Sequence, residues 1–317
     1  MVTLPADSLE AVRVSVPALV ELSRAAAGLT LRHGRKRAQM SGEYLSRFKG
    51  RGMEFAESRP YEPGDDVRNL HWRVMARTGK PFTKQFHEER ERPVFIWVDL
   101  RDRMFFGTRG AYKAVIAARA AALVAWAASQ HGDRIGGVIF SDGEHHEIKP
   151  GRGKAAVLYI LRRIVEHPAW TRHERTGDDR TDDDNRSARE AMIRLRRVVR
   201  PGSLIFLLSD FANLDAVTET NLAELARHNE LILMQIYDEI EAELPPPGNY
   251  RLSDGVDEMI LDAADPNYRA LYAKRFEMRL EQVRNLARRH RMSYLTCRTD
   301  QDPARILRQG LGSRRSA

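Results

Sequence analysis

From Pro93 to the C-terminus, short apolar runs alternate with longer segments in which apolar and polar residues recur at helical spacing. The runs VFIWVD (94–99) and SLIFLLSD (203–210) are rich in β-branched and aromatic residues. Such runs are typical of parallel strands covered on both faces. The same reasoning predicts strands in RIGGVIF with its partner HHEIKP, in LILMQIYD and in RMSYLTC, and a hairpin in GNYRLSDGVDEMILD.

The segments between these strands are helical in pattern. Helices are predicted at 110–130, 154–166, 188–200, 214–227 and 266–291, with shorter ones at 17–27 and from Pro303. Alternating strands and helices indicate an open, doubly wound, mostly parallel α/β sheet, in which ligands bind outside the carboxyl ends of the strands. Asp99 and Asp210 each follow a strand at that end, so we expect them to face one crevice.

The first ninety residues lack this alternation. They mix Gly, Pro and charge with short alternating runs, which predicts small strands and turns docked on something larger. We therefore expect a β-rich N-terminal extension with a helix and a basic loop (1–90), an α/β domain (91–310) and a basic tail (311–317). The most polar stretch, RTGDDRTDDDNRSARE (175–190), is expected to be a loop.

Composition narrows the class of protein. Of 317 residues, 42% are hydrophobic and 30% charged, an ordinary balance for a soluble globular protein. The apolar stretch 114–128 is shorter than the roughly 20 residues that span a bilayer, and the N-terminus lacks the profile of a secretory signal. We therefore expect a cytoplasmic protein without a membrane span. Cys297 is the single cysteine, which excludes internal disulfides, and its apolar-flanked run predicts a buried, inert thiol.

The net charge of +8 is compatible with an anionic partner. The basic stretch LRHGRKRAQMSGEYLSRFKGRG (31–52) interleaves cations with Tyr44 and Phe48 and could follow a phosphate backbone. A solvated loop, or a patch for an acidic protein surface, is the simpler interpretation. We rank a nucleic-acid binder below it.

Motifs for enzymatic chemistry are missing from the sequence. GRGK (151–154) has Ile148 where a phosphate-binding loop needs glycine, and the chain contains neither GxSxG nor HExxH. A metal-dependent hydrolase that uses Asp99 and Asp210 is the alternative, but neither strand end carries a nucleophile or a positioned histidine. We expect a protein that is not an enzyme.

The loop VDLRDRM departs from a metal site in a specific way. A metal-dependent adhesion site uses DxSxS after the first strand, a distant Thr and an Asp after a later strand, because their oxygens suit a hard divalent ion. Asp99, Thr181 and Asp210 match three positions. Arg101 and Arg103 occupy the positions of the two serines. We predict a degenerate site without a cofactor, in which a guanidinium replaces the ion between the carboxylates and arginine attracts an acidic partner; magnesium stays the alternative.

The segment RPYEPGDDVRNLHWRVMARTG (59–79) resembles the signature of the domain-of-unknown-function 58 (DUF58) family. FHEERERPVFIWVDLRDRMFFG, GDRIGGVIF and LIFLLSDF follow in the family's order. The resemblance implies a von Willebrand factor A-like domain. Because family members are commonly encoded beside MoxR-type AAA+ ATPases, it also implies a non-enzymatic interaction module that assists such an ATPase in assembly or maturation. Two positions depart from the family's pattern: His71 stands where Asp is usual, and the metal motif lacks its serines.

Within the signature, EPGDD predicts a turn whose acids, Asp65 or Asp66, pair with a nearby arginine such as Arg68, Arg73 or Arg77. The signature residues expected to contact a partner are Arg59, Tyr61, Asp65, Asp66, Arg68, Trp72 and Arg77. Trp72 is predicted to anchor the segment on the sheet domain, so that Trp72→Ala would cost about 3 kcal/mol or more. An exposed Trp72 would indicate a partner surface instead.

Overall fold

The computed structural model describes residues 6–31, 53–63, 65, 67–88, 92–172, 184–212, 214–253 and 258–312. The chain forms two compact units. Residues 1–34 and 92–317 make up the larger one, here called the sheet unit, and residues 35–91 make up the smaller one, here called the signature unit.

The sheet unit is built on six strands in the order β10-β7-β6-β3-β4-β5. They are β3 (Val94–Asp99), β4 (Ile135–Phe140), β5 (His145–Gly151), β6 (Leu204–Ser209), β7 (Glu230–Tyr237) and β10 (Ser293–Arg298). The strands pair in parallel, except that β5 runs antiparallel to β4. β3, β4 and β6 are buried along their whole length. Gly137 allows close packing of β4 on β3, since a Cβ there would lie 2.3 Å from the Ile96 carbonyl oxygen.

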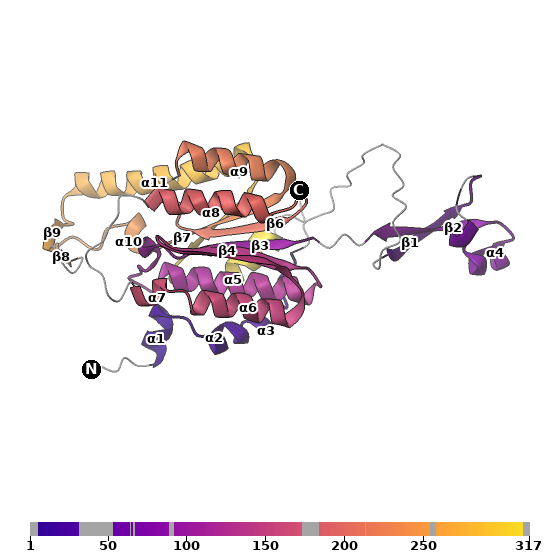
Figure 1. Ribbon diagram of the computed structural model, residues 1–317. Coiled ribbons are helices and arrows are strands. Elements are labelled where there is room, and N and C mark those ends of the chain that lie inside the picture. Colours follow the sequence, from indigo (N-terminus) through magenta and orange to yellow (C-terminus); the bar gives the residue numbers. More distant parts are fainter. Residues whose placement is uncertain are drawn as a thin grey trace. The chain divides into compact units, whose positions relative to one another are not determined.

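Helices cover both faces of this sheet (Figure 1). One face carries α5 (Lys113–Gln130), α6 (Gly153–Val165), α7 (Ala169–Arg172) and α12 (Pro303–Gly312). The other face carries α8 (Asp184–Val198), α9 (Ala216–His228) and α11 (Pro266–Arg289). The predicted class, a doubly wound and mostly parallel α/β sheet, is confirmed. The expected loop at 175–190 is wrong in its second half, because α8 begins at Asp184.

The chain between β7 and α11 forms a small excursion from the sheet. It contains the short helix α10 (Glu239–Ala242) and the antiparallel strands β8 (Asn249–Ser253) and β9 (Glu258–Asp262). The predicted hairpin is therefore present.

Three N-terminal helices complete the sheet unit: α1 (Ala6–Val12), α2 (Val16–Glu21) and α3 (Ser23–Ala26). Leu19 and Leu29 are buried in the same core as α5, and the indole Nε1 of Trp126 donates to the Leu19 carbonyl oxygen at 3.1 Å. The structure thus divides the chain differently from the sequence-based boundary at residue 90. The N-terminal helices pack with the sheet, and the separate unit starts only after them.

The signature unit contains the antiparallel strands β1 (Met53–Pro60) and β2 (Phe82–Glu88). Between them lie the 3₁₀ turn η1 (Val67–Asn69) and the helix α4 (Trp72–Thr78). The strands were expected, whereas α4 lies where only strands and turns were predicted. Both of its ends are capped: His71 Nδ1 accepts from the Val74 N–H at 3.2 Å, and Gly79 adopts the left-handed conformation at φ 69°.

Two expectations from composition can be compared with the fold. Among the described helices, none combines the length and the apolar character needed to cross a bilayer. Cys297 is fully buried on β10, and burial raises the pKa of its thiol to about 12. The prediction of a buried thiol is confirmed.

Candidate functional site

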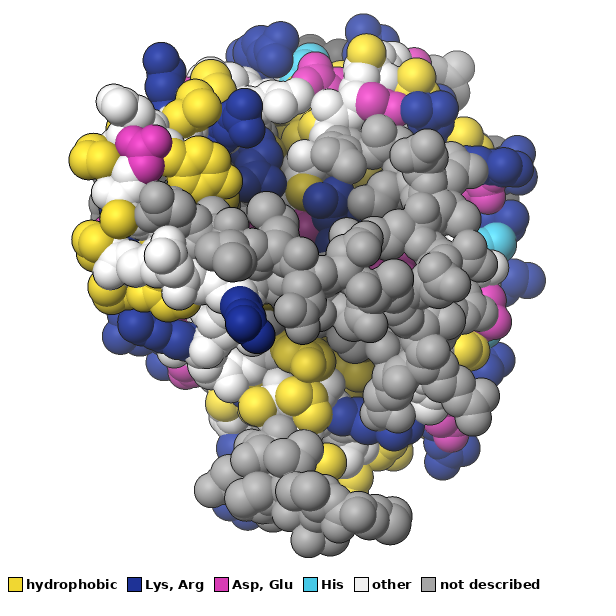
Figure 2. Space-filling model, turned by 90° about the vertical axis from the view of Figure 1, so that its left-hand side faces the viewer, with side chains coloured by type: hydrophobic (Ala, Val, Ile, Leu, Met, Phe, Trp, Pro, Cys, Tyr) yellow, Lys and Arg dark blue, Asp and Glu magenta, His cyan; other side chains and the backbone are white. Residues whose placement is uncertain are grey.

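Asp99 and Asp210 lie together at the carboxyl end of the sheet. Asp99 is the last residue of β3, Asp210 follows β6, and these two strands are parallel neighbours. Both carboxylates are buried. The face at this end of the sheet shows Lys and Arg side chains gathered around a hollow near its middle (Figure 2). The two aspartates therefore lie at the edge of the sheet where residues that follow parallel strands come together, as expected from the sequence.

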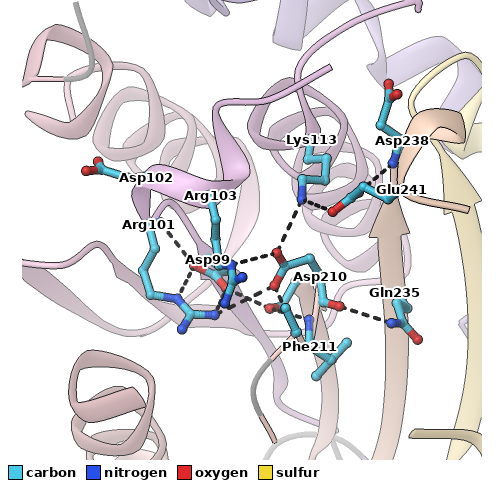
Figure 3. A network of polar contacts seen from close by, with 12 residues as sticks. Asp99, Arg101, Asp102, Arg103, Lys113, Asp210, Phe211, Gln235, Asp238 and Glu241 are labelled. Atoms are coloured by element: carbon cyan, nitrogen blue, oxygen red, sulfur yellow. Dashed lines mark hydrogen bonds and ion pairs between the residues drawn. The ribbon is translucent and has the colours of Figure 1, made fainter. Parts of the chain in front are cut away.

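The guanidinium of Arg101 lies between the two aspartates (Figure 3). Its Nε donates to Asp99 Oδ1 at 2.9 Å and its Nη2 donates to Asp99 Oδ2 at 2.6 Å, while Nη2 is 3.8 Å from Asp210 Oδ1. The backbone N–H of Arg101 also donates to Asp99 Oδ1, at 3.0 Å. The pair is a bidentate, charge-assisted contact in a buried environment, with the guanidinium also 5.7 Å from the centre of the Phe140 ring.

Asp210 is surrounded by cations. Its Oδ2 is 3.3 Å from both Lys113 Nζ and Arg103 Nε, and its Oδ1 accepts from the Ala212 N–H at 3.1 Å. Burial raises the pKa of this carboxyl, but the charges of Lys113, Arg101 and Arg103 outweigh burial. The pKa of Asp210 therefore lies below its ordinary value, and the group is a carboxylate near neutral pH.

Ser209 and Gln235 hold the turn after β6 in place. Ser209 Oγ donates to Asp99 Oδ2 at 2.6 Å and accepts from the Phe211 N–H at 3.1 Å. Gln235 Nε2 donates to the Asp210 carbonyl oxygen at 3.0 Å. Phe211 has a positive φ of 48°, which costs a bulky residue conformational energy and persists because these contacts define the turn.

Opposite charges balance in this network. Lys113, almost fully buried at the start of α5, also reaches Glu241 Oε1 at 3.0 Å. The network thus contains the carboxylates of Asp99, Asp210 and Glu241 and the cations of Arg101, Arg103 and Lys113. A divalent ion at Asp99 would have to displace the Arg101 guanidinium. Within the described residues there is no group of three or more His, Cys, Asp or Glu side chains that could hold a metal ion. A metal-free site nevertheless stays a prediction.

The sequence missed four members of the network: Lys113, Ser209, Gln235 and Glu241. Two of them carry a recognisable signal. Lys113 is a charged residue at the head of a long, largely apolar helix, a place where a buried lysine requires an anionic partner. Ser209 immediately precedes Asp210 and follows a buried strand.

The role expected for Arg101 needs a correction. Its side chain is only 3% exposed and its fork is occupied by Asp99, so it holds the site together and cannot contact an acidic partner in this conformation. Arg103 is 29% exposed, so part of its side chain lies at the surface. Thr181, Asp66 and the stretch 32–52 lie outside the described residues.

In the signature unit, Asp65 pairs with Arg59 and not with Arg73 or Arg77. Arg59 Nη2 donates to Asp65 Oδ1 at 2.6 Å, and the Glu62 N–H donates to Asp65 Oδ2 at 3.0 Å. The Glu62 N–H and the Arg59 guanidinium hold the pKa of Asp65 below its usual range. The Tyr61 N–H donates to the Pro81 carbonyl oxygen at 3.0 Å, so this turn is fixed on the start of β2.

The remaining signature residues lie at the surface. Arg68 and Arg77 are exposed. Trp72 is 62% exposed, so it is not buried by its own unit, and its expected anchoring on the sheet unit stays a prediction. Its exposure fits the other interpretation, a surface for a partner.

A third buried aspartate, Asp238, has a structural role. It accepts from the Thr299 hydroxyl at 2.6 Å, from the Thr108 N–H at 2.8 Å and hydroxyl, and from the Ile240 N–H at 3.1 Å. Burial raises its pKa, but the threonine hydroxyls and backbone donors outweigh burial and the pKa is lowered. Asp238 thereby joins three chain segments at the carboxyl end of the sheet.

Comparisons with known proteins place the chain among relatives. The family model described as "Protein of unknown function DUF58" matches residues 57–282. Uncharacterised proteins of Mycobacterium tuberculosis (strain ATCC 25618 / H37Rv) and Mycobacterium bovis are each 30% identical over 264 residues, which is 83% of this chain and 80% of theirs.

The chain also matches solved structures at low sequence identity. The conserved hypothetical protein BatB from Bacteroides thetaiotaomicron is 12% identical, with a TM-score of 0.39, and the match covers 71% of this chain and all of that one. A von Willebrand factor type A protein from Catenulispora acidiphila is 11% identical, with a TM-score of 0.35, and the match covers 74% of this chain and 43% of that one.

Proposed function

Because the chain belongs to the DUF58 family, we propose that it is a non-enzymatic protein-interaction module that works in the cytoplasm with a MoxR-type AAA+ ATPase. Its task would be to bring a client to that ATPase during assembly or maturation of a protein complex. The ATPase partner rests on the family resemblance alone. The interaction role also has support from the chemistry of the site.

The observation that carries the proposal is the neutralised ionic network at the carboxyl end of the sheet. Both oxygens of Asp99 are engaged, by Arg101 and by Ser209, so Asp99 is not free to act as a base or to bind a metal ion. Asp210 is held as a carboxylate by three cations and is poorly placed to accept a proton. The two carboxylates are therefore better suited to hold the loops at this end of the sheet in place than to catalyse a reaction.

The partner-binding edge of this site would be formed by Arg103. Its side chain pairs with Asp210 and is partly exposed beside the buried network, where it would attract an acidic partner, the ATPase or its acidic protein client. A buried Arg101 holds the loop that presents it.

The alternative functions have less support. The hydrolase would need Asp99 free, and no described histidine contacts Asp99 or Asp210. A nucleic-acid binder would use the stretch 31–52. Neutralising Arg35, Lys36 and Arg37 tests it, and only weak binding that falls steeply with salt is expected.

Binding to the MoxR-type ATPase of the same organism tests the proposal. The purified proteins should form a complex in size-exclusion chromatography, and Arg103→Glu should weaken it. Lys154→Glu is the matched control, because α6 follows the antiparallel strand β5 and therefore starts at the opposite end of the sheet. No complex with any nucleotide state of the ATPase, or equal weakening by both variants, would contradict the proposal.

A further inference from the structure

The exposure of Trp72 distinguishes it from the other tryptophans of this chain. Of the four, Trp97, Trp126 and Trp170 are buried in the sheet unit, whereas Trp72 is 62% exposed in the signature unit. A tryptophan with this exposure is uncommon on a protein surface, and tryptophan is among the residues enriched at interface hot spots. The side chain therefore calls for a binding explanation.

Trp72 shares one face of α4 with two arginines. Trp72, Arg73, Ala76 and Arg77 occupy positions i, i+1, i+4 and i+5 of the helix, and all four are exposed. No described acidic side chain pairs with Arg73 or Arg77. This α4 face thus offers a flat aromatic ring beside two exposed guanidinium groups.

The helix that carries this face is held firmly at both ends. Besides the caps at His71 and Gly79, the Thr78 hydroxyl donates to the Val74 carbonyl oxygen at 2.8 Å, and the His71 N–H donates to the Phe82 carbonyl oxygen of β2 at 2.7 Å. A preorganised face loses little conformational freedom on binding. The backbone of α4 thus holds the Trp72 indole and the Arg73 and Arg77 guanidinium groups in a fixed arrangement.

We infer that the α4 face is a docking surface for an acidic segment of a partner protein. Trp72 would pack on an apolar side chain of that segment, and Arg73 and Arg77 would pair with its carboxylates. The inference rests on the proposed function, since it names the chemistry by which the module holds its partner.

Charge and size favour a protein over nucleic acid. A helix of seven residues is about 10 Å long, which is enough for two carboxylates but short for a phosphate track. Glu62, with a side chain 77% exposed, belongs to the same small unit and would repel a phosphate backbone. A carboxylate-bearing segment can place its acids at the two arginines alone.

Fluorescence of the full-length protein tests the inference, because Trp72 is the exposed one of the four tryptophans. The probe is a synthetic helical peptide of Glu and Leu, with a Gln-for-Glu copy as control. Acrylamide should quench a component of the emission that Trp72→Phe lacks, and the Glu peptide should shift this component to shorter wavelength and protect it. If acrylamide does not reach Trp72 in the free protein, the residue packs on its own chain and the inference fails.

Charge reversal supplies the specificity control. Arg73→Glu with Arg77→Glu should weaken peptide binding by about tenfold or more. Lys274→Glu with Arg275→Glu makes the same change in net charge at exposed positions of α11 and should leave binding within about twofold of the wild type. Equal loss in both double variants, or tighter binding of single-stranded DNA or phosphatidylglycerol vesicles than of the peptide, would overturn the inference.

The MoxR-type ATPase separates this inference from the proposed function. If the ATPase binds the wild type and the Arg73→Glu, Arg77→Glu variant equally, the docking surface is wrong and the proposed function stands. If the peptide binds at α4 and the ATPase does not bind at all, the proposed partner is wrong and the docking surface stands.

Discussion

Arg101 forms two parallel hydrogen bonds with Asp99, of 2.9 and 2.6 Å, although only one residue separates them in the chain. In the predicted degenerate adhesion motif, Arg101 takes the sequence position of the first serine. The nearby Asp210 would repel Asp99 if no cation lay between them. A permanent cation carried by the chain itself removes the need for a divalent ion.

We therefore predict that the protein does not bind Mg²⁺ or Mn²⁺ at millimolar concentration. Isothermal titration calorimetry measures this directly. A divalent ion would have to break the Asp99–Arg101 pair and face the positive charges of Arg103 and Lys113. A bound ion held by Asp99 in the wild-type protein would falsify the arginine-for-metal hypothesis.

Restoring the two hydroxyl positions should reverse this preference. Arg101→Ser with Arg103→Ser should lower the free energy of unfolding by about 3–5 kcal/mol, because Asp99 and Asp210 lose their main cations while staying buried. Adding Mg²⁺ should recover part of the loss. Arg103→Ser alone is the control and should cost less, since that side chain is partly exposed. Denaturant unfolding with and without Mg²⁺ measures both effects, and a double variant as stable as the wild type would contradict the account.

The charge on Asp210 should appear in the pH dependence of stability. Because its folded pKa lies below its ordinary value, its carboxylate contributes stability above the unfolded pKa, and this contribution is lost as pH falls through the folded pKa. Asp210→Asn should therefore cost about 3 kcal/mol near neutral pH, and the gap to the wild type should narrow below about pH 4. Urea unfolding across this range measures the gap. A gap that is constant with pH would show that the cost comes from packing alone.

The sheet, and the position of Asp99 and Asp210 at its carboxyl end, could be predicted because their sequence signals are local. A continuous apolar run such as VFIWVD indicates a strand that is buried on both faces. An aspartate at the end of such a strand lies at the carboxyl end of the sheet. Most of the residues that contact Asp99 and Asp210 could not be predicted from the sequence. Lys113 reaches Asp210, and Glu241 reaches Lys113, from elements that are distant in sequence, and only the folded chain brings them together.

The errors in the signature unit have a different origin. α4 is too short for periodicity to show, and its boundaries depend on His71 and Gly79 as caps. The burial of Trp72 was predicted from its size, yet Arg73, Ala76 and Arg77 share its helix face. Once α4 is recognised as a helix, these neighbours indicate that the face is exposed. The exposure of Trp72 could therefore be predicted only after residues 72–78 had been recognised as a helix.

Trp72→Ala should consequently be mild. We expect a loss below about 1 kcal/mol, because a side chain that is 62% exposed leaves little cavity when it is truncated. Trp170→Ala is the contrasting control and should cost about 3–5 kcal/mol, since Trp170 is buried and its Nε1 donates to the Ile164 carbonyl oxygen at 2.7 Å. Hydrogen exchange of the β1–β2 amides reports on Trp72, and denaturant unfolding on Trp170. A large loss for Trp72→Ala would restore the anchor hypothesis.

Cys297 should be unreactive in the folded protein. Its thiol is fully buried and burial raises its pKa to about 12, so the thiolate that attacks a disulfide reagent is scarce at neutral pH. Ellman's reagent should label it only after addition of denaturant. Prompt labelling of the native protein would mean that β10 opens readily at the edge of the sheet.

The cap at His71 provides a last test of the signature unit. His71→Asp should stabilise α4, because a carboxylate accepts from the same N–H groups and adds a favourable interaction with the positive end of the helix dipole. His71→Ala should destabilise it by about 1 kcal/mol, since the Val74 N–H loses its side-chain acceptor. Exchange of the Val74 and Met75 amides should slow in the first variant and accelerate in the second. If both substitutions change the exchange rates in the same direction, His71 acts through packing and not as a cap.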